Sequence, residues 1–551
     1  MTPPRAAVFV LVALITPSTA FAAAAMLFLN GNFHTLDDSA PQASAVAIKE
    51  GRIVYVGDDA AAQAHRTADM RVIDLRRLTV VPGLNDSHMH LVGVGFRELT
   101  FDLAGTGSAA ELQRRVREHA STTPAGHWIN GRGWIETHWS PPVFPTAREL
   151  DAAAPEHPVA LTRADGHALV VNSAALRLAG INTATPDPPA GAILRDPETG
   201  EATGVLIDAA MDLVRRLIPG PTPEEVEHAL IVGAEREVAL GWTAIQIAGH
   251  PFEESEMVRR LVAGGRIRVR VFDAVAAPGD GARRLMDGGV VIGESGGRYT
   301  RRGLKFYMDG ALGSRGAALL EPYADAATSG LIVQDSGEYR TYLERALRSG
   351  IQVQTHAIGD RANRTVLDHY AAAFAAVPRE ERAVPDPRWR IEHAQVLHAD
   401  DIPRFAKLGV IASMQPSHAI SDLFFAPSRL GPGRLRGAYA WQPLLATGAV
   451  IAAGSDAPVE RGEPMIEFYA AVARRAPDGF SAEGWHPEHR MTRPQALRAM
   501  TLDAAYTVFE EKERGSIEVG KLADFTVLSA DIMEIPEAEI LTTRCVMTVV
   551  G

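Results

Sequence analysis

The sequence predicts an α/β protein: a (β/α)8 TIM barrel together with a small β domain built from both chain ends. Two observations carry this prediction. Short β-branched runs alternate with Ala-, Leu- and Arg-rich helical stretches through the middle of the chain. Both ends instead contain short strands broken by Gly, Asn and Asp turns. Alternation of strand and helix favours a parallel sheet, and eight repeats favour a closed barrel.

The expected barrel comprises residues 81–509. Its first strand is in "VVPGLNDSHMH", residues 80–90. The other seven are "WTAIQIAG" (242–249), "IRVRVFDAV" (267–275), "GLKFYMDG" (303–310), "IQVQTHAIGD" (351–360), "WRIEHAQ" (389–395), "GVIASMQP" (409–416) and "GAVIAAGSD" (448–456). The interval between the first two strands is too long for a simple repeat. We therefore expect an insertion at about residues 100–225, acting as a lid or a substrate wall.

The β domain is expected from residues 23–80 plus 510–551. Segments such as "SAVAIKEGRIVYVGDD" and "GSIEVGKLADFTVLS" read as strands separated by turns. Chain termini often lie close together at a protein surface, which permits the two ends to pair.

The first residues have the pattern of a secretory signal peptide. One arginine precedes the apolar run "AAVFVLVALI", and Ala20-Phe21-Ala22 fits the small-residue cleavage rule. Residues 1–22 are therefore expected to be removed, which places the protein in the periplasm or outside the cell. The alternative is a disordered apolar tail or an uncleaved anchor. No later stretch reads as a membrane helix.

The charge and the cysteine content of the sequence exclude two further properties. The formal charge of -12 is spread along the chain, which argues against nucleic-acid binding, since that requires a basic surface. The single cysteine, Cys545, rules out an internal disulfide bond. We expect a small-molecule substrate and no membrane attachment once the signal is removed. A homodimer is compatible with the sequence.

Side chains suited to metal binding stand at the ends of five expected strands. Strand ends meet at the mouth of a barrel, where active sites are built. A lone strand-end histidine is more often structural, but so many at one edge indicate a catalytic site. The six residues are His88, His90, Lys305, His356, His393 and Asp456.

Catalytic zinc prefers nitrogen and oxygen ligands and keeps one position for water. His88, His90 and Asp456 would hold one ion, and His356 with His393 a second. The ammonium of Lys305 would repel a cation. It fits only if burial neutralises it, or if carbon dioxide converts it to a carbamate that bridges two ions. The sequence leaves open one ion or two, and zinc or another divalent metal.

These six residues resemble the pattern of the amidohydrolase superfamily. Flanking segments such as "GRGWIETHW", "KFYMDGALGSRGAALLEPYAD" and "THAIGDRAN" are similar to its YtcJ-like branch, which includes N-substituted formamide deformylase. The resemblance covers nearly all of the chain after residue 22. It implies a barrel, a flanking β-sandwich made from both chain ends, and metal-dependent hydrolysis of amide-like, non-peptide carbon–nitrogen bonds. The branch often has Asp after "GRGW", whereas Ile135 and Glu136 follow here.

In the expected mechanism Asp456 is the catalytic base and then the acid. Trp134 or His167 is a candidate oxyanion donor, and Arg315 a candidate anchor for an acidic substrate group; each could equally be structural. Asp309 and Asp360 are expected to orient the strand-end loops. Four histidines outside the strand ends are expected to be ordinary surface or loop residues: His398, His418, His486 and His489.

Two other functions compete with this one. A mononuclear deaminase on the same fold usually lacks the strand-four lysine and carries a glutamate soon after the fifth strand's histidine. Lys305 and the "AIGD" that follows His356 argue against it. A secreted, non-catalytic binding protein would have no need for six matched residues.

Overall fold

The computed structural model describes residues 25–164, 166–189, 191–481 and 483–551. The expected signal peptide, residues 1–22, lies outside these ranges. The chain forms two compact units. The first contains residues up to Met89, Glu237–Ser255 and Arg268–Gly551, and the second contains His90–Arg236 and Glu256–Ile267. Within the described ranges, no helix is long and apolar enough to cross a membrane.

A parallel eight-stranded sheet is the centre of the first unit, and it confirms the predicted barrel. Each of the eight predicted runs overlaps a different strand of this sheet, and neighbours along the chain are neighbours in the sheet. In order, the strands are β8 (Leu84–Met89), β15 (Trp242–His250), β16 (Arg270–Ala276), β18 (Tyr299–Tyr307), β19 (Gln352–Ala357), β20 (Arg390–His393), β21 (Ile411–Met414) and β22 (Ile451–Ala453). A short strand, β17 (Val291–Gly293), pairs antiparallel with β18.

The barrel closes where the chain after β22 meets β8. The Asp456 backbone N–H donates to the His88 carbonyl at 2.7 Å, and the Ser455 N–H donates to the Asp86 carboxylate at 2.8 Å. Gly454 makes this approach possible, because a Cβ there would stand 2.4 Å from the His88 nitrogen. The closure therefore brings the first and last strands' functional residues together.

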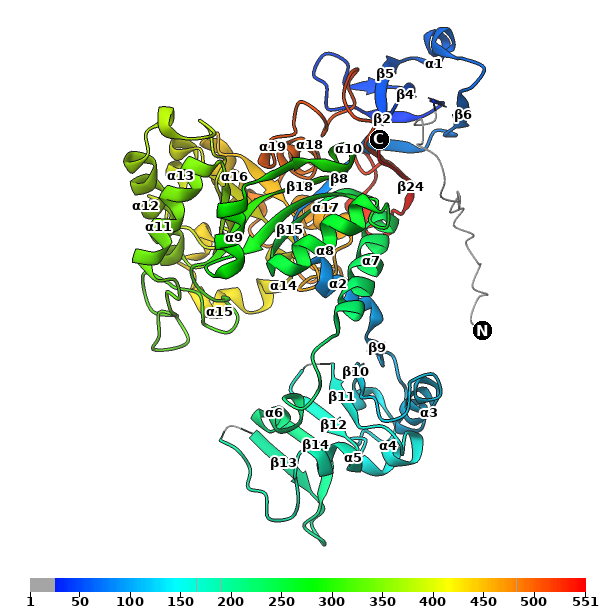
Figure 1. Cartoon of the computed structure of the whole chain (residues 1–551), viewed down its shortest axis with the longest axis vertical. Coiled ribbons are helices and arrows are strands. Elements are labelled where there is room, and N and C mark those ends of the chain that lie inside the picture. Colours follow the sequence, from blue (N-terminus) through cyan, green and yellow to red (C-terminus); the bar gives the residue numbers. More distant parts are fainter. Residues whose placement is uncertain (1–24, 165, 190, 482) are drawn as a thin grey trace. The chain divides into compact units, whose positions relative to one another are not determined.

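Helices follow the strands along the chain and cover the outside of the sheet (Figure 1). α11 shows how the sequence sets their ends. The Asp335 side chain caps its first turn, and Gly350 ends it with a φ of 70°. The helices are α9 (Asp280–Gly288), α11 (Ser336–Ser349), α12 (Asp360–Ala376), α13 (Ile402–Leu408), α14 (Pro416–Ser421), α15 (Ala426–Leu430), α16 (Trp441–Ala446), α17 (Pro464–Ala473), α18 (Arg493–Ala499) and α19 (Leu502–Thr507).

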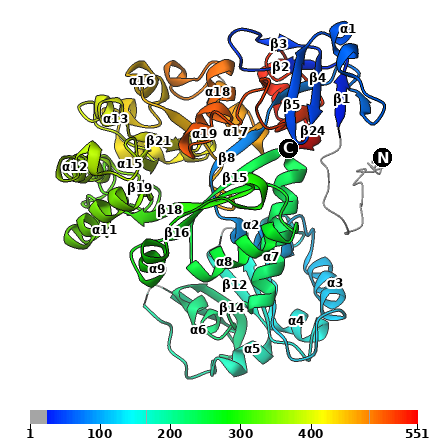
Figure 2. The same cartoon turned by 45° about the horizontal axis from the view of Figure 1, so that its top comes forward.

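The two chain ends form a β-sandwich within the same unit, as predicted. One sheet holds β1 (Met26–Leu29), β4 (Ala45–Lys49), β5 (Arg52–Gly57) and β6 (Arg71–Asp74). The other holds β2 (Asn32–His34), β3 (Gln42–Ala43), β7 (Thr79–Pro82), β23 (Phe525–Leu528) and β24 (Cys545–Val549). β7 pairs antiparallel with β23, so the N-terminal strands lie beside the C-terminal ones (Figure 2). Phe28 packs edge-on against Phe525, with ring centroids 5.0 Å apart.

The second unit contains the region expected as an insertion. Its six-stranded sheet runs β13 (Gly191–Arg195), β14 (Ala202–Asp208), β12 (Ala168–Val171), β11 (Val159–Arg163), β10 (Ile129–Trp134) and β9 (Phe101–Asp102). Its helices include α2 (Leu91–Leu99), α3 (Ala109–Ala120), α4 (Ala147–Ala153), α5 (Ser173–Leu178), α6 (Asp212–Arg215) and most of α7 (Pro223–Leu240). A capping box begins α7, since Thr222 and Glu225 bond each other's backbone N–H.

Candidate metal centre

Five of the six predicted ligands lie at the carboxyl-terminal ends of barrel strands in the first unit. His88 is in β8, Lys305 in β18, His356 in β19, and His393 ends β20. Asp456 follows β22, and its backbone is held by His88. The sixth ligand, His90, comes directly after β8. Since the strands are parallel, these ends meet at one edge of the sheet.

His88, His90 and Asp456 form a three-residue group in which the donor atoms all lie within 4.8 Å of one another. The His88 Nε2 is 3.6 Å from the Asp456 Oδ1. Both side chains are buried. This is the combination expected for the first ion.

A buried ionic network fixes the ring of His88. Its Nδ1 contacts the Glu392 carboxylate, which leaves Nε2 to face Asp456. Arg390 donates to both oxygens of Glu392, at 2.7 and 3.0 Å. Burial alone would raise the pKa of Glu392, but Arg390 and His88 outweigh it and hold that pKa well below its usual value. A carboxylate behind a ligating histidine is the usual means of fixing its tautomer.

The second three-residue group differs from the prediction. It joins His393 and Asp456 to His418, again with donor atoms within 4.8 Å of one another. His418 is 8% exposed and its ring stacks on that of His393, with centroids 5.7 Å apart. The interpretation of His418 as an ordinary surface or loop residue was therefore wrong. His489 is also buried, where it contacts the Arg436 carbonyl.

His356 lies beside this group without completing it. Its ring is 4.5 Å from that of His393 between centroids. Its Nε2 is 3.5 Å from the Asp309 Oδ1. The expected pair of His356 and His393 is thus adjacent, but His356 belongs to neither three-residue group among the described residues.

Lys305 is almost wholly buried within the cluster. Its Nζ is 3.5 Å from the His88 Nε2 and 4.9 Å from the centre of the Tyr307 ring. Burial lowers the pKa of Lys305 to about 8, against the opposing effect of the Glu392 and Asp456 carboxylates. A larger share of its amine is therefore neutral near pH 7 than for a lysine in water.

The donor set fits a divalent metal. Burial lowers the pKa of His88 to about 4 and that of His356 to about 3, so both rings are neutral and can donate a lone pair. The buried Nε2 atoms of His356 and His418 have no hydrogen-bond partner among the described residues. His393 and Asp456 have φ angles of 74° and 56°, a strained conformation typical of functional sites. A bound metal ion could engage the Nε2 atoms of His356 and His418.

Asp309 and Arg315 organise the loops around the strand ends. The Asp309 carboxylate accepts three backbone N–H groups, from Ala318, Ile358 and Gly359. It therefore orients the loops after β18 and β19, as predicted, and Asp360 similarly accepts from Leu320. Arg315, the candidate substrate anchor, donates twice to Asp325, at 3.1 and 2.9 Å. In this structure the Arg315 guanidinium therefore links two parts of the loop that follows β18.

Trp134 and His167 belong to the second unit. Trp134 is fully buried in its core, and its indole N–H donates to the Leu161 carbonyl at 2.9 Å. His167 is exposed and its Nδ1 is 2.7 Å from Asp208. Glu136, which follows Ile135 in the segment that departs from the branch pattern, pairs with Arg163. The Trp134 N–H is thus already used within its own domain.

Three residues of the site were missed from the sequence: Glu392, Gln415 and His418. The sequence could have indicated Glu392, because alternation along β20 puts Arg390 and Glu392 on one face of a buried strand. Gln415 directly follows β21 and bonds the His393 Nδ1 at 2.7 Å. His418 lies one helical turn beyond, so a search confined to strand ends passed over it.

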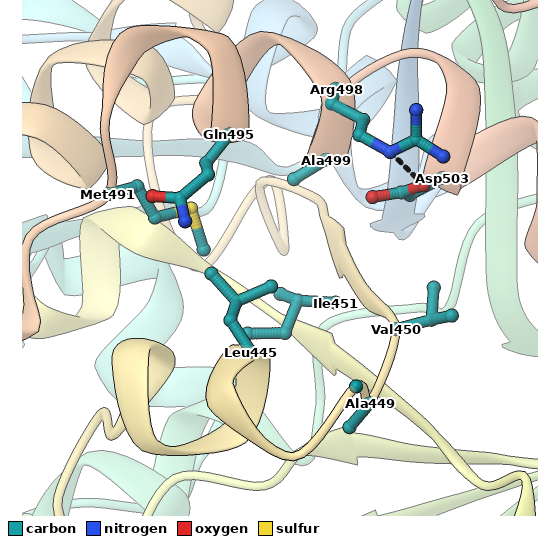
Figure 3. Close-up of a pocket in the computed structure, with 10 residues that line it drawn as sticks. Leu445, Ala449, Val450, Ile451, Met491, Gln495, Arg498, Ala499 and Asp503 are labelled. Carbon is teal, nitrogen blue, oxygen red and sulfur yellow. Dashed lines mark ion pairs between the residues drawn. The ribbon is translucent and has the colours of Figure 1, made fainter. Parts of the chain in front are cut away.

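A separate pocket of about 230 Å³ lies at the opposite end of β22 (Figure 3). Its walls include Gly448 to Ile451, which precede or begin that strand, whereas Asp456 follows it. Arg498 and Asp503 pair at its rim. This pocket is therefore distinct from the metal centre.

Comparison with known proteins agrees with this site. The amidohydrolase family model matches residues 71–551. The putative amidohydrolase YtcJ of Bacillus subtilis is 31% identical, covering 95% of this chain and 97% of its own. The N-substituted formamide deformylase of Arthrobacter pascens is 29% identical over 95% and 97%. An uncharacterized metal-dependent hydrolase from Pyrococcus horikoshii superposes with a TM-score of 0.74 at 26% identity, covering 93% and 99%.

A closed parallel barrel with clustered histidines and aspartate at its carboxyl-terminal edge defines a metal-dependent hydrolase. The chain belongs to the amidohydrolase family.

Proposed function

We propose that this protein hydrolyses a carbon–nitrogen bond of a small molecule, an amide, a formamide or a related non-peptide bond. The observation that carries the proposal is the position of Asp456, which belongs to both three-residue groups. The similarity to a formamide deformylase over 95% of the chain supports the choice of bond.

When bound, a divalent metal, which we propose is zinc, would lower the pKa of a water molecule and polarise the substrate carbonyl. Among the protein's side chains, Asp456 transfers the proton. Its buried carboxylate accepts the proton of the attacking water and delivers it to the leaving nitrogen. His88 and Asp86 hold the backbone around Asp456, which fixes the carboxylate at the strand edge.

Lys305 is proposed to react with carbon dioxide and become a carbamate, which would serve as a metal ligand. The neutral amine adds to the carbon of carbon dioxide and loses one proton, so the product is an anion; the lowered pKa of Lys305 raises the share of neutral amine. The carbamate would place an anionic oxygen ligand where the ammonium otherwise stands 3.5 Å from the His88 Nε2.

We also propose that the protein is exported to the periplasm or the medium, on the pattern of residues 1–22. Cell fractionation with and without these residues tests this. Retention of the full-length protein in the cytoplasm would contradict export.

The test of the function is a panel of N-substituted formamides and N-acyl amines, with release of free amine as the readout. Asp456→Asn should lower kcat about a hundredfold to ten-thousandfold while keeping the fold and most of the metal. His398→Asn is the matched control, since His398 is half-exposed. Ammonia release from amino-heterocycles, without amine release, would favour a deaminase instead. Wild-type turnover by Asp456→Asn would exclude the proton-transfer role.

A further inference from the structure

A tyrosine at the end of β18 is exposed beside the metal centre. Tyr307 is the last residue of β18 and lies two residues after Lys305, so both side chains are on the same face of the strand. The residues on either side, Phe306 and Met308, are buried, whereas Tyr307 is 41% exposed. The end of β18 therefore presents an aromatic ring to solvent on the face that carries the lysine.

The ring of Tyr307 lies against two residues of the predicted metal centre. Its centroid is 4.9 Å from the Lys305 Nζ and 5.6 Å from the centroid of the His356 ring. Tyr307 and His356 are also paired in register across β18 and β19. A molecule that approaches Lys305 and His356 from solvent on this side meets the tyrosine ring.

Other exposed apolar side chains lie along the same edge of the sheet. The Val333 N–H donates to the Met308 carbonyl at 2.9 Å, and Leu331 and Val333 are both exposed. Val459, whose N–H donates to the Asp456 carbonyl at 2.8 Å, is exposed as well. Apolar and aromatic side chains around a few polar groups are the usual lining of a small-molecule site.

Three arginines that contact the loop after β18 are each engaged within the protein. Arg315 and Arg429 both pair with the Asp325 carboxylate. Arg361 donates to two backbone carbonyls of the same loop. An acidic group on the substrate would have to compete with these partners, so this side of the site favours an uncharged group.

We propose that Tyr307 determines substrate specificity, by packing its exposed ring against a flat, uncharged group carried on the nitrogen of the substrate amide. The inference rests on the proposed function and names the substrate class for that site. Aromatic groups pack on one another in offset or edge-on arrangements, and such pairs are favourable beyond the area that they bury. The ring of Tyr307, and not its hydroxyl, makes this contact.

The first test compares three formamides that differ only in the group on nitrogen: N-(2-phenylethyl)formamide, N-methylformamide and N-formylglycine. We expect wild-type kcat/KM to be at least about tenfold higher for the phenylethyl compound than for either of the others. Tyr307→Ala should lose most of this ratio, and Tyr307→Phe should keep it. Ile292→Ala is the control, since Ile292 is an exposed apolar residue of β17, which pairs with the opposite part of β18.

The second test measures binding without turnover. The probe is 2-phenylethanol, which has the aromatic group but no bond to hydrolyse, and ligand-observed NMR follows its titration into each holoenzyme. We expect Tyr307→Ala to bind the probe at least roughly fivefold more weakly than wild type, while Tyr307→Phe and Ile292→Ala match the wild type. Far-UV circular dichroism checks that each variant is folded, and Tyr307→Leu replaces the Ala variant if that variant unfolds.

A wild-type preference that Tyr307→Ala retains would overturn the inference and leave the hydrolase proposal intact. Equal or better turnover of N-methylformamide or N-formylglycine by the wild type would also overturn it. If no compound releases amine, the hydrolase proposal fails on these substrates, and the binding test still decides the role of the ring. Equal affinity of wild type and Tyr307→Ala for 2-phenylethanol would then reject that role too.

Discussion

At the scale of single residues, the site depends on the positions of two buried ionisable side chains, Asp456 and Lys305. Asp456 is shared by both ligand groups, and Lys305 stands among three neutral histidines. Both residues were found from the sequence because each belongs to a strand-end pattern. Trp134, in the segment "GRGW", was a candidate oxyanion donor in the sequence. It proved to be a core residue, which shows that an aromatic side chain carries no positional information by itself.

Replacing Lys305 by Ala tests the carbamate. The variant should lose activity by at least about tenfold, because the proposed carbamate ligand would be absent. Added acetate or propionate should restore part of it by occupying the vacated space. Lys407→Ala, an exposed lysine of α13, is the control and should match the wild type. Full activity of Lys305→Ala without added acid would exclude the bridging role.

At the scale of elements, the barrel was predictable because each strand is a short β-branched run bounded by helical stretches. The alternation of strand-like and helical stretches predicted all eight strands and their order in the sheet. His418 was not predictable by the same means, since the strand passes into α14 without a loop. The division into two units was also not read from the sequence. The long interval predicted an insertion, but its own six-stranded sheet has no distinct signal.

Barrel closure at Gly454 gives a prediction at this scale. Gly454→Ala should lower the free energy of unfolding by about 1–3 kcal/mol, because its Cβ would press on the His88 nitrogen. Gly433→Ala has nothing within 4 Å of the added Cβ and should stay within about 0.5 kcal/mol of the wild type. Urea denaturation compares the three proteins. Equal midpoints would show that closure tolerates the extra carbon.

At the scale of the whole molecule, the two chain ends and the barrel share one unit. The sandwich core draws on Phe28, Phe33 and Val46 from the N-terminal side and on Phe525 and Val527 from the C-terminal side. A buried pair, Arg270 of β16 with Asp524 beside β23, links barrel to sandwich at 2.7 and 3.0 Å. The pairing of the ends was predictable from their shared strand pattern. This link was not, because the two residues are far apart in sequence and neither lies in a recognisable motif.

We propose that this barrel holds catalytic metal. Ions per chain, counted by elemental mass spectrometry on protein prepared with zinc and bicarbonate, test it most directly. We predict close to two ions per chain, removed by a chelator together with activity and regained with it on readdition of zinc. Protein that binds no ion under these conditions would contradict the account.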